Sequence, residues 1–214
     1  MPLWRGGSAI PACLANRASP PKLFVSGAVL AFAYLVRPTN SLSFAFLGLY
    51  YLVNSRRHFW AYAAGAVAVL APYFVDNWVN YGNLFPPYSY QLFERLGTPA
   101  AVAQALAGTL VSPNRGLFVF TPLFVFAIQG ARISLSKNGI AKGNLDVYIV
   151  AILISHWITT SMFEDWGGAW SIGPRYFVEV IPYLMILLTP VVDGLYTSAR
   201  GWRYLFICLA AFSI

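Results

Sequence analysis

The segment 164–176 holds the densest group of side chains that could do chemistry, and it reads EDWGGAWSIGPRY. Arg175 follows a proline, and its guanidinium group can donate two parallel hydrogen bonds to a phosphate. Trp166 and Trp170 have flat apolar faces that could cover a sugar ring. Both residue types also have ordinary roles at a membrane surface, where tryptophan forms interfacial belts and arginine reaches toward lipid headgroups. The segment therefore indicates either an anion and sugar site or an interfacial loop.

Carboxylates in and near this segment are the candidate general bases. Glu164 and Asp165 could accept a proton from an attacking hydroxyl group if neighbouring groups position them, and the alternative is that both are solvated loop acids. His156 and Glu179 lie inside apolar runs. An ionisable side chain is costly in lipid, so we expect both to face the interior of a helix bundle. We interpret them as packing residues rather than as catalysts.

Two further arginines resemble Arg175 in their setting. Arg115 ends the turn-like sequence SPNR directly before an apolar run, so it repeats the pattern of turn residues followed by a cation. Arg37, in the sequence RPTN, is a third and lower-ranked candidate, because a lone interfacial arginine is common. Several arginines on one face of a membrane would indicate a bound anion.

The composition predicts that lipid, rather than water, surrounds most of the chain. Of the 214 residues, 58% are apolar and 10% are charged, whereas soluble domains have about 25% charged residues. The net charge of +7 does not indicate nucleic-acid binding, because the basic residues lie in short gaps between apolar runs. Cys13 and Cys208 have no metal-ligand spacing, and nucleotide-binding and metalloprotease motifs are absent from the sequence. We expect a membrane protein with no cofactor, no metal and no nucleic-acid partner.

Apolar runs predict the helices of an all-α, polytopic membrane bundle that forms a single domain over residues 1–214. We count six to seven segments, and the first two are shorter than the roughly 20 residues that a span needs. Pro38 lies between these two and disfavours one continuous helix, so they form either a short hairpin or two tilted spans. The runs are Leu23–Val36, Leu42–Val53, Phe59–Val75, Leu117–Ala131, Val147–Phe163, Phe177–Val192 and the residues from Tyr204 onward.

The distribution of basic residues predicts the orientation of these segments. Lysine and arginine concentrate in cytoplasmic loops, and with the hairpin in place ten basic residues fall on one side and four on the other. The larger group is Arg5, Arg17, Lys22, Arg56, Arg57, Arg132, Lys137, Lys142, Arg200 and Arg203, and the smaller is Arg37, Arg95, Arg115 and Arg175. The loops 76–116 and 164–176 are therefore expected outside the cytoplasm, and the first contains a possible interfacial helix, PAAVAQALAGTLV.

The two ends of the sequence predict that the chain is part of a larger protein. The N-terminal residues have positive charges but lack the continuous apolar stretch of a secretory signal. The last apolar run, Tyr204–Ile214, has 11 residues, about half of what a spanning helix needs.

Four pieces of the sequence, in order, resemble bacterial multi-spanning glycosyltransferases of the GT-C superfamily, the class that includes protein mannosyltransferase-like enzymes. The pieces are LVRPTN, YGNLFPPYS, SPNRGLFVFTPL and WGGAWSIGPRYFVEVIPYL. The similarity runs from about Gly27 to Leu187 and covers the middle and later part of such an enzyme. The junction at SPNRG and the loop with two tryptophans and Gly-Pro-Arg are its most specific parts.

The resemblance implies a sugar donor linked to a polyprenyl phosphate and transfer on the extracytoplasmic side of the cell membrane. In that setting Arg175 and Arg115 would bind the phosphate, and Arg37 would be a weaker third contact. The sugar or the acceptor would lie against an aromatic wall, and one amide side chain would form a hydrogen bond with it. The wall would consist of Trp166, Trp170, Tyr81 and Tyr88, and the amide would be that of Asn80. The superfamily places its catalytic acid in the first extracytoplasmic loop, but this sequence has no acidic residue before Asp76. Asp165 is then the substitute candidate for the base.

Two other functions compete with this one. A transporter or lipid flippase would use His156 and Glu179 as a path across the membrane, although transporters commonly contain internal repeats and this sequence has no convincing one. A third hypothesis is that the chain is a non-catalytic remnant of a membrane protein. The sequence leaves the sugar, the acceptor and the oligomeric state open.

Overall fold

The structure, a computed structural model, describes residues 19–85, 96–139, 143–163, 165–167, 172–195 and 200–213. The regular elements within these ranges are all helical, and one isolated bridge pairs Leu96 with Phe163. The prediction of an all-α fold is therefore confirmed for this part of the chain. The predicted site residues Tyr88 and Trp170, like Glu164, lie outside the described residues.

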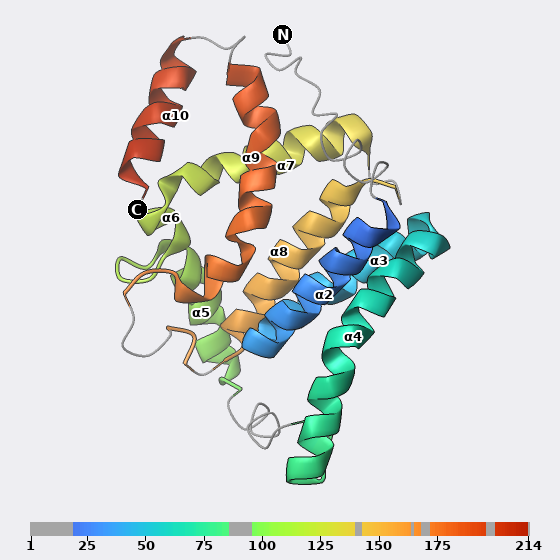
Figure 1. The fold of residues 1–214 in the computed structure, drawn as a ribbon. Coiled ribbons are helices and arrows are strands. Elements are labelled where there is room, and N and C mark those ends of the chain that lie inside the picture. The colour runs from blue at the N-terminus through green and yellow to red at the C-terminus, as the bar shows by residue number, and fades with distance from the viewer. Residues whose placement is uncertain are drawn as a thin grey trace.

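Figure 1 shows the helices in chain order, from α2 to α10. The first group consists of α2 (Pro20–Val36), η1 (Pro38–Asn40), α3 (Ser41–Asn54), α4 (Arg56–Tyr81) and α5 (Pro99–Val111). The second consists of α6 (Leu117–Phe120), η3 (Pro122–Phe124), α7 (Val125–Asn138), α8 (Leu145–Ser161), η4 (Arg175–Val180), α9 (Ile181–Leu195) and α10 (Arg200–Phe212).

Helices α2 and α3 form a helical hairpin about η1, and α2 packs closely against α4 (Figure 1). Two glycines make this approach possible. A Cβ atom on Gly27 would lie 1.9 Å from the carbonyl oxygen of Tyr62, and one on Gly65 would lie 1.9 Å from that of Phe24. Backbone therefore meets backbone at this crossing, the kind of small-residue packing that joins helices in membranes.

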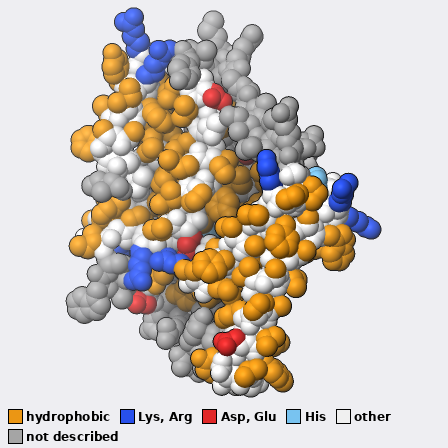
Figure 2. All heavy atoms as spheres, in the orientation of Figure 1, with side chains coloured by type: hydrophobic (Ala, Val, Ile, Leu, Met, Phe, Trp, Pro, Cys, Tyr) orange, Lys and Arg blue, Asp and Glu red, His pale blue; other side chains and the backbone are white. Residues whose placement is uncertain are grey.

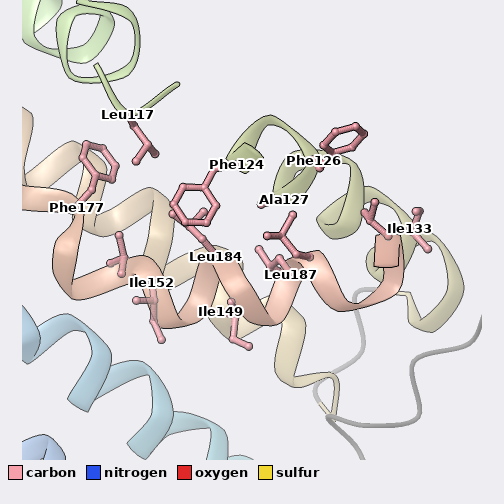
Figure 3. Close-up of a cluster of buried hydrophobic side chains, with 13 residues drawn as sticks. Leu117, Phe124, Phe126, Ala127, Ile133, Ile149, Ile152, Phe177, Leu184 and Leu187 are labelled. Atoms are coloured by element: carbon pink, nitrogen blue, oxygen red, sulfur yellow. The ribbon is translucent and has the colours of Figure 1, made fainter. Parts of the chain in front are cut away.

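The main core lies between α6, η3, α7, α8, η4 and α9. Figure 3 shows its side chains, which come from segments on both sides of the 139–144 connection, among them Phe124, Ile152 and Leu187. Here again a glycine permits close contact, because a Cβ atom on Gly130 of α7 would lie 1.7 Å from the carbonyl oxygen of Leu187 on α9.

The apolar run Leu117–Ala131, which the sequence predicts as one segment, is divided in the structure. Helix α6 ends at Phe120, Thr121 has φ −134° and ψ 69°, and η3 follows before α7 begins. Pro122 explains the break, since it has no N–H to donate and excludes helical conformation from the residue before it.

Two of the described helical segments are long and apolar enough to cross a membrane, Arg56–Tyr81 with 26 residues and Arg175–Leu195 with 21. Three further apolar helices, α2, α5 and α8, are shorter. Large hydrophobic side chains are exposed along them, and Figure 2 shows hydrophobic atoms over much of the visible face. Exposed apolar surface of this extent is typical of a protein that contacts lipid or a large apolar partner.

Candidate functional site

A small depression brings together three of the residues that the sequence singles out, Arg115, Arg175 and Trp166. The segments that form it are the end of α5, the turn 112–116, residues 166–167 and 173–174, and η4. Its full lining is Thr109, Arg115, Trp166, Gly167, Gly173, Pro174, Arg175, Tyr176 and Phe177. The free space is about 10 Å³, about one water molecule. Arg115 and Arg175 therefore line one depression together with Trp166, although the two arginines are far apart in sequence.

The turn that presents Arg115 is set by the sequence SPNRG. The carbonyl oxygen of Ser112 accepts hydrogen bonds from the backbone N–H groups of Arg115, at 3.2 Å, and Gly116, at 2.7 Å. Pro113 suits the second position of such a turn because its φ is fixed. A Cβ atom on Gly116 would lie 2.6 Å from the backbone nitrogen of Ser112, so the turn closes tightly only with glycine.

The segment that carries Arg175 docks onto this turn through its backbone. The N–H of Gly173 donates to the carbonyl oxygen of Asn114 at 2.9 Å, and Gly173 has φ +89°, a conformation that favours glycine. The N–H of Arg175 then donates to the carbonyl oxygen of Gly173 at 2.9 Å, with Pro174 at φ −81° and ψ 61°. This is an inverse γ-turn. Local backbone geometry therefore directs Arg175 toward the same depression as Arg115.

Two glycines receive the larger side chains of the site. A Cβ atom on Gly167 would lie 1.7 Å from Nη1 of Arg115, so the guanidinium group lies directly against this glycine. A Cβ atom on Gly108 of α5 would lie 2.4 Å from the ring of Trp166. The indole is thus packed on α5 and half-buried, so it is held by protein on one face.

Asp165 lies beside the depression but does not line it. Its side chain is exposed, and its backbone carbonyl oxygen accepts a 3.4 Å hydrogen bond from the hydroxyl group of Tyr176. Asp165 is therefore on the same loop as Trp166, next to a residue that lines the depression.

Asn80 and Tyr81 do not line this depression. The sequence places both in the loop from residue 76, whereas α4 continues through Tyr81 and ends at Gly82, which has φ +66°. Both side chains are exposed, and Nδ2 of Asn80 donates to Oδ1 of Asp76 at 2.9 Å. Asn80 and Tyr81, which the sequence assigns to the sugar or acceptor site, thus lie at the C-terminal end of α4.

Arg37 pairs with Glu179 instead of lining the depression. Its Nη1 lies 3.0 Å from Oε1 of Glu179, and the hydroxyl group of Thr39 donates to Oε2 at 2.5 Å. The carboxyl side chain is 7% exposed, which confirms the prediction that Glu179 faces the interior. A buried carboxylate needs such partners, so this arginine joins the first hairpin to η4.

His156 is also buried, as predicted, at 2% exposure. Its Nε2 lies 2.7 Å from the carbonyl oxygen of Tyr176, and its ring packs edge-on against Phe177. The next residue on α8, Trp157, donates from Nε1 to the hydroxyl oxygen of Thr109 at 3.0 Å and to the carbonyl oxygen of Leu106 at 3.2 Å.

An apolar cavity of about 290 Å³ adjoins the depression, and the sequence analysis did not predict it. Its lining side chains are all apolar and come from α5 to α9, among them Leu110, Phe118, Leu153, Trp157 and Leu184. Phe177 lines both spaces. Sequence reasoning also missed Thr109, Gly108 and Trp157, since a threonine, a glycine or an indole inside an apolar run is an ordinary helix residue until its partner is known.

Comparison of the chain with protein families, with curated proteins and with solved structures finds no match. Among the described residues, groups of three or more His, Cys, Asp or Glu side chains that could hold a metal ion are also absent. The side chains that line the depression could bind an anion through two arginines, next to an aromatic ring and an apolar cavity.

Proposed function

We propose that the chain is an integral membrane glycosyltransferase, or part of one, that uses a polyprenyl-phosphate-linked sugar as donor. The sugar would pass to an acceptor on the extracytoplasmic side of the membrane. The observation that carries the proposal is the pairing of a cationic, aromatic depression with an apolar cavity across the shared side chain of Phe177. A lipid-linked phosphate needs cationic groups for its phosphate and an adjoining apolar space for its lipid chain.

The two arginines would bind the phosphate. Arginine donates in a planar fork that matches phosphate oxygens, and Arg115 and Arg175 line one depression. The phosphate gains charge as the bond to the sugar breaks, so fixed cations at this position stabilise the transition state more than the bound donor. Trp166 would lie against the sugar ring.

The apolar cavity would hold the first isoprenoid units of the donor. Each buried methylene group contributes about 0.8 kcal/mol, and an isoprenoid chain has no polar atoms that would need partners in such a space. Residues of the core line this cavity, among them Leu117, Leu184 and Leu187 (Figure 3), and we propose that a lipid enters it from the bilayer.

We further propose that six to seven apolar segments enter or cross the cytoplasmic membrane, with the basic loops in the cytoplasm. The order of the elements supports this arrangement. Helices α2 and α4 begin at the same end of the bundle, near Lys22 and Arg56, whereas Arg37 follows the opposite end of α2 (Figure 1). Arg200 begins α10 after α9 has returned across the bundle, so it lies on the side of Lys22.

Binding of polyprenyl phosphate by the chain in lipid nanodiscs tests the proposal, with polyprenol as the uncharged reference. Arg115→Ala and Arg175→Ala are each expected to weaken binding of the phosphate about 10- to 100-fold, since a hydrogen bond to a charged group contributes about 1.5–3 kcal/mol. Polyprenol binding should stay unchanged. Arg200→Ala, in an exposed arginine at the other end of the bundle, is the control. Equal binding of phosphate and alcohol by the unmodified chain would refute the proposal.

Asp165 is proposed as the base that accepts the proton of the acceptor hydroxyl group. Its exposed position beside Trp166 supports this role. Asp165→Asn should lower the rate of sugar transfer about 100-fold or more, with binding of polyprenyl phosphate preserved. The measurement is turnover of a panel of polyprenyl-phosphate monosaccharides by the complete enzyme. Unchanged turnover in the asparagine variant would remove Asp165 from the mechanism and leave the phosphate site intact.

A transporter or flippase would need His156 and Glu179 to carry protons or substrate. Both have partners that explain their burial, the Tyr176 carbonyl group and Arg37. The proposal therefore gives neither a role in translocation. A non-catalytic remnant remains the alternative outcome of the transfer assay, in which polyprenyl phosphate binds but no sugar moves.

A further inference from the structure

Two consecutive residues of α8, His156 and Trp157, hold the two segments that carry the arginines of the site. We propose that this pair is a positioning device that sets the separation of Arg115 and Arg175, and so determines affinity for the phosphate of the donor. The inference rests on the proposed function and assigns it two further residues.

The first arm of the device is His156. A carbonyl oxygen only accepts hydrogen bonds, so Nε2 of His156 carries the proton that it shares with the Tyr176 carbonyl group over 2.7 Å. Tyr176 follows Arg175 directly, and Phe177 packs on the imidazole ring. A side chain that is 2% exposed therefore fixes the backbone one residue away from the guanidinium-bearing position.

The second arm is Trp157, which binds α5. Its Nε1–H is shared between the Leu106 carbonyl oxygen and the hydroxyl oxygen of Thr109. Thr109 donates its own proton to the carbonyl oxygen of Ala105 at 2.8 Å, so its oxygen is free to accept from the indole. This contact lies at the last turn of α5, just before the turn that presents Arg115.

The side chains of successive residues in an α-helix point about 100° apart. His156 and Trp157 can therefore reach two different segments, the one at Tyr176 and helix α5. Both arms end on residues that line the depression, Thr109 and Tyr176. Bonds from a third element hold the two segments in place and keep the site arranged for phosphate before it binds, which is the condition for strong electrostatic binding.

The test measures dissociation constants for polyprenyl phosphate and for polyprenol, with the chain in nanodiscs. His156→Leu and Trp157→Phe should each reduce the preference for phosphate over alcohol about tenfold, because misplacement of a positioned group by about 1 Å costs up to 100-fold. His156→Gln, whose amide can donate in place of Nε2, should restore most of the preference. His58→Leu and Trp60→Phe, both on α4, are the matched controls.

Each outcome bears on one of the two proposals. If the unmodified chain prefers phosphate but His156→Leu and Trp157→Phe keep that preference in full, the positioning role is wrong and the phosphate site stands. If the unmodified chain has no preference, the proposed function itself fails. A parallel loss of polyprenol binding, or a His156→Gln variant as weak as His156→Leu, would also overturn the positioning role, since both mean that only packing was disturbed.

Discussion

Gly167→Ala is expected to weaken binding of polyprenyl phosphate about 10- to 100-fold, as much as loss of the Arg115 guanidinium group. The added methyl group would lie 1.7 Å from Nη1 and 2.6 Å from Cζ of that arginine. The atoms that the methyl group would meet belong to the end of a flexible side chain and not to backbone, so we expect the Arg115 side chain to move. The added methyl group thus displaces the Arg115 guanidinium group from the site, while the net charge of the chain stays the same. Titration with polyprenyl phosphate in nanodiscs measures the effect.

A double-variant cycle separates this explanation from a general disturbance. If the alanine acts through Arg115, the combined Gly167→Ala and Arg115→Ala variant binds no more weakly than either single variant. Gly201→Ala is the matched control, because a Cβ atom there has no neighbour within 4 Å. Additive losses in the double variant, or full affinity in Gly167→Ala, would contradict the assigned contact.

Gly65→Ala is expected to have a large effect on stability, because its methyl group would meet backbone and has no flexible neighbour to displace. It would lie 1.9 Å from the carbonyl oxygen of Phe24 and 2.7 Å from the carbonyl carbon. Helices α2 and α4 must then separate along their whole contact, at a cost of about 1–3 kcal/mol or more. Unfolding in mixed detergent micelles, followed by circular dichroism, should report this loss.

Gly48→Ala provides the comparison within the same three helices. Its Cβ atom would lie 3.4 Å from the Tyr62 ring, an ordinary contact distance, and alanine favours a helix over glycine. Stability should therefore be preserved or slightly raised. Equal stability of the Gly65 and Gly48 variants would show that the α2–α4 crossing is looser than described.

The sequence predicts helices best where local rules and packing agree. Helix α5 spans Pro99–Val111, the same residues as the predicted interfacial helix, because Thr98 accepts a hydrogen bond from the N–H of Ala101 and proline fits the first helical position. The division between α2 and α3 at Arg37 follows from Pro38 in the same way. Pro122 carries the same local signal, but it lies within a continuous apolar run, and hydropathy alone merges α6 and α7.

The site could be predicted only in part, because its assembly depends on contacts between distant segments. A repeated pattern of turn residues before a cation identified Arg115 and Arg175, and both line the depression. Arg37 was predicted at the same depth, with its turn residues after it rather than before it, and Glu179 binds it. Asn80 was assigned to a loop because its neighbours are polar, although α4 extends past it. The residues that hold the site together, Thr109 and Trp157, have no local signal at all.

The ion pair between Arg37 and Glu179 also bears on how the chain is made. The two residues are 142 positions apart, and a ribosome that adds about 5–20 residues per second needs about 7–28 s to cover that distance. During this time the first hairpin has left the ribosome with an arginine whose partner does not yet exist. We therefore expect the α2–α3 hairpin to fold first in a provisional position, and it becomes anchored to η4 only when the segment that begins with Arg175 arrives.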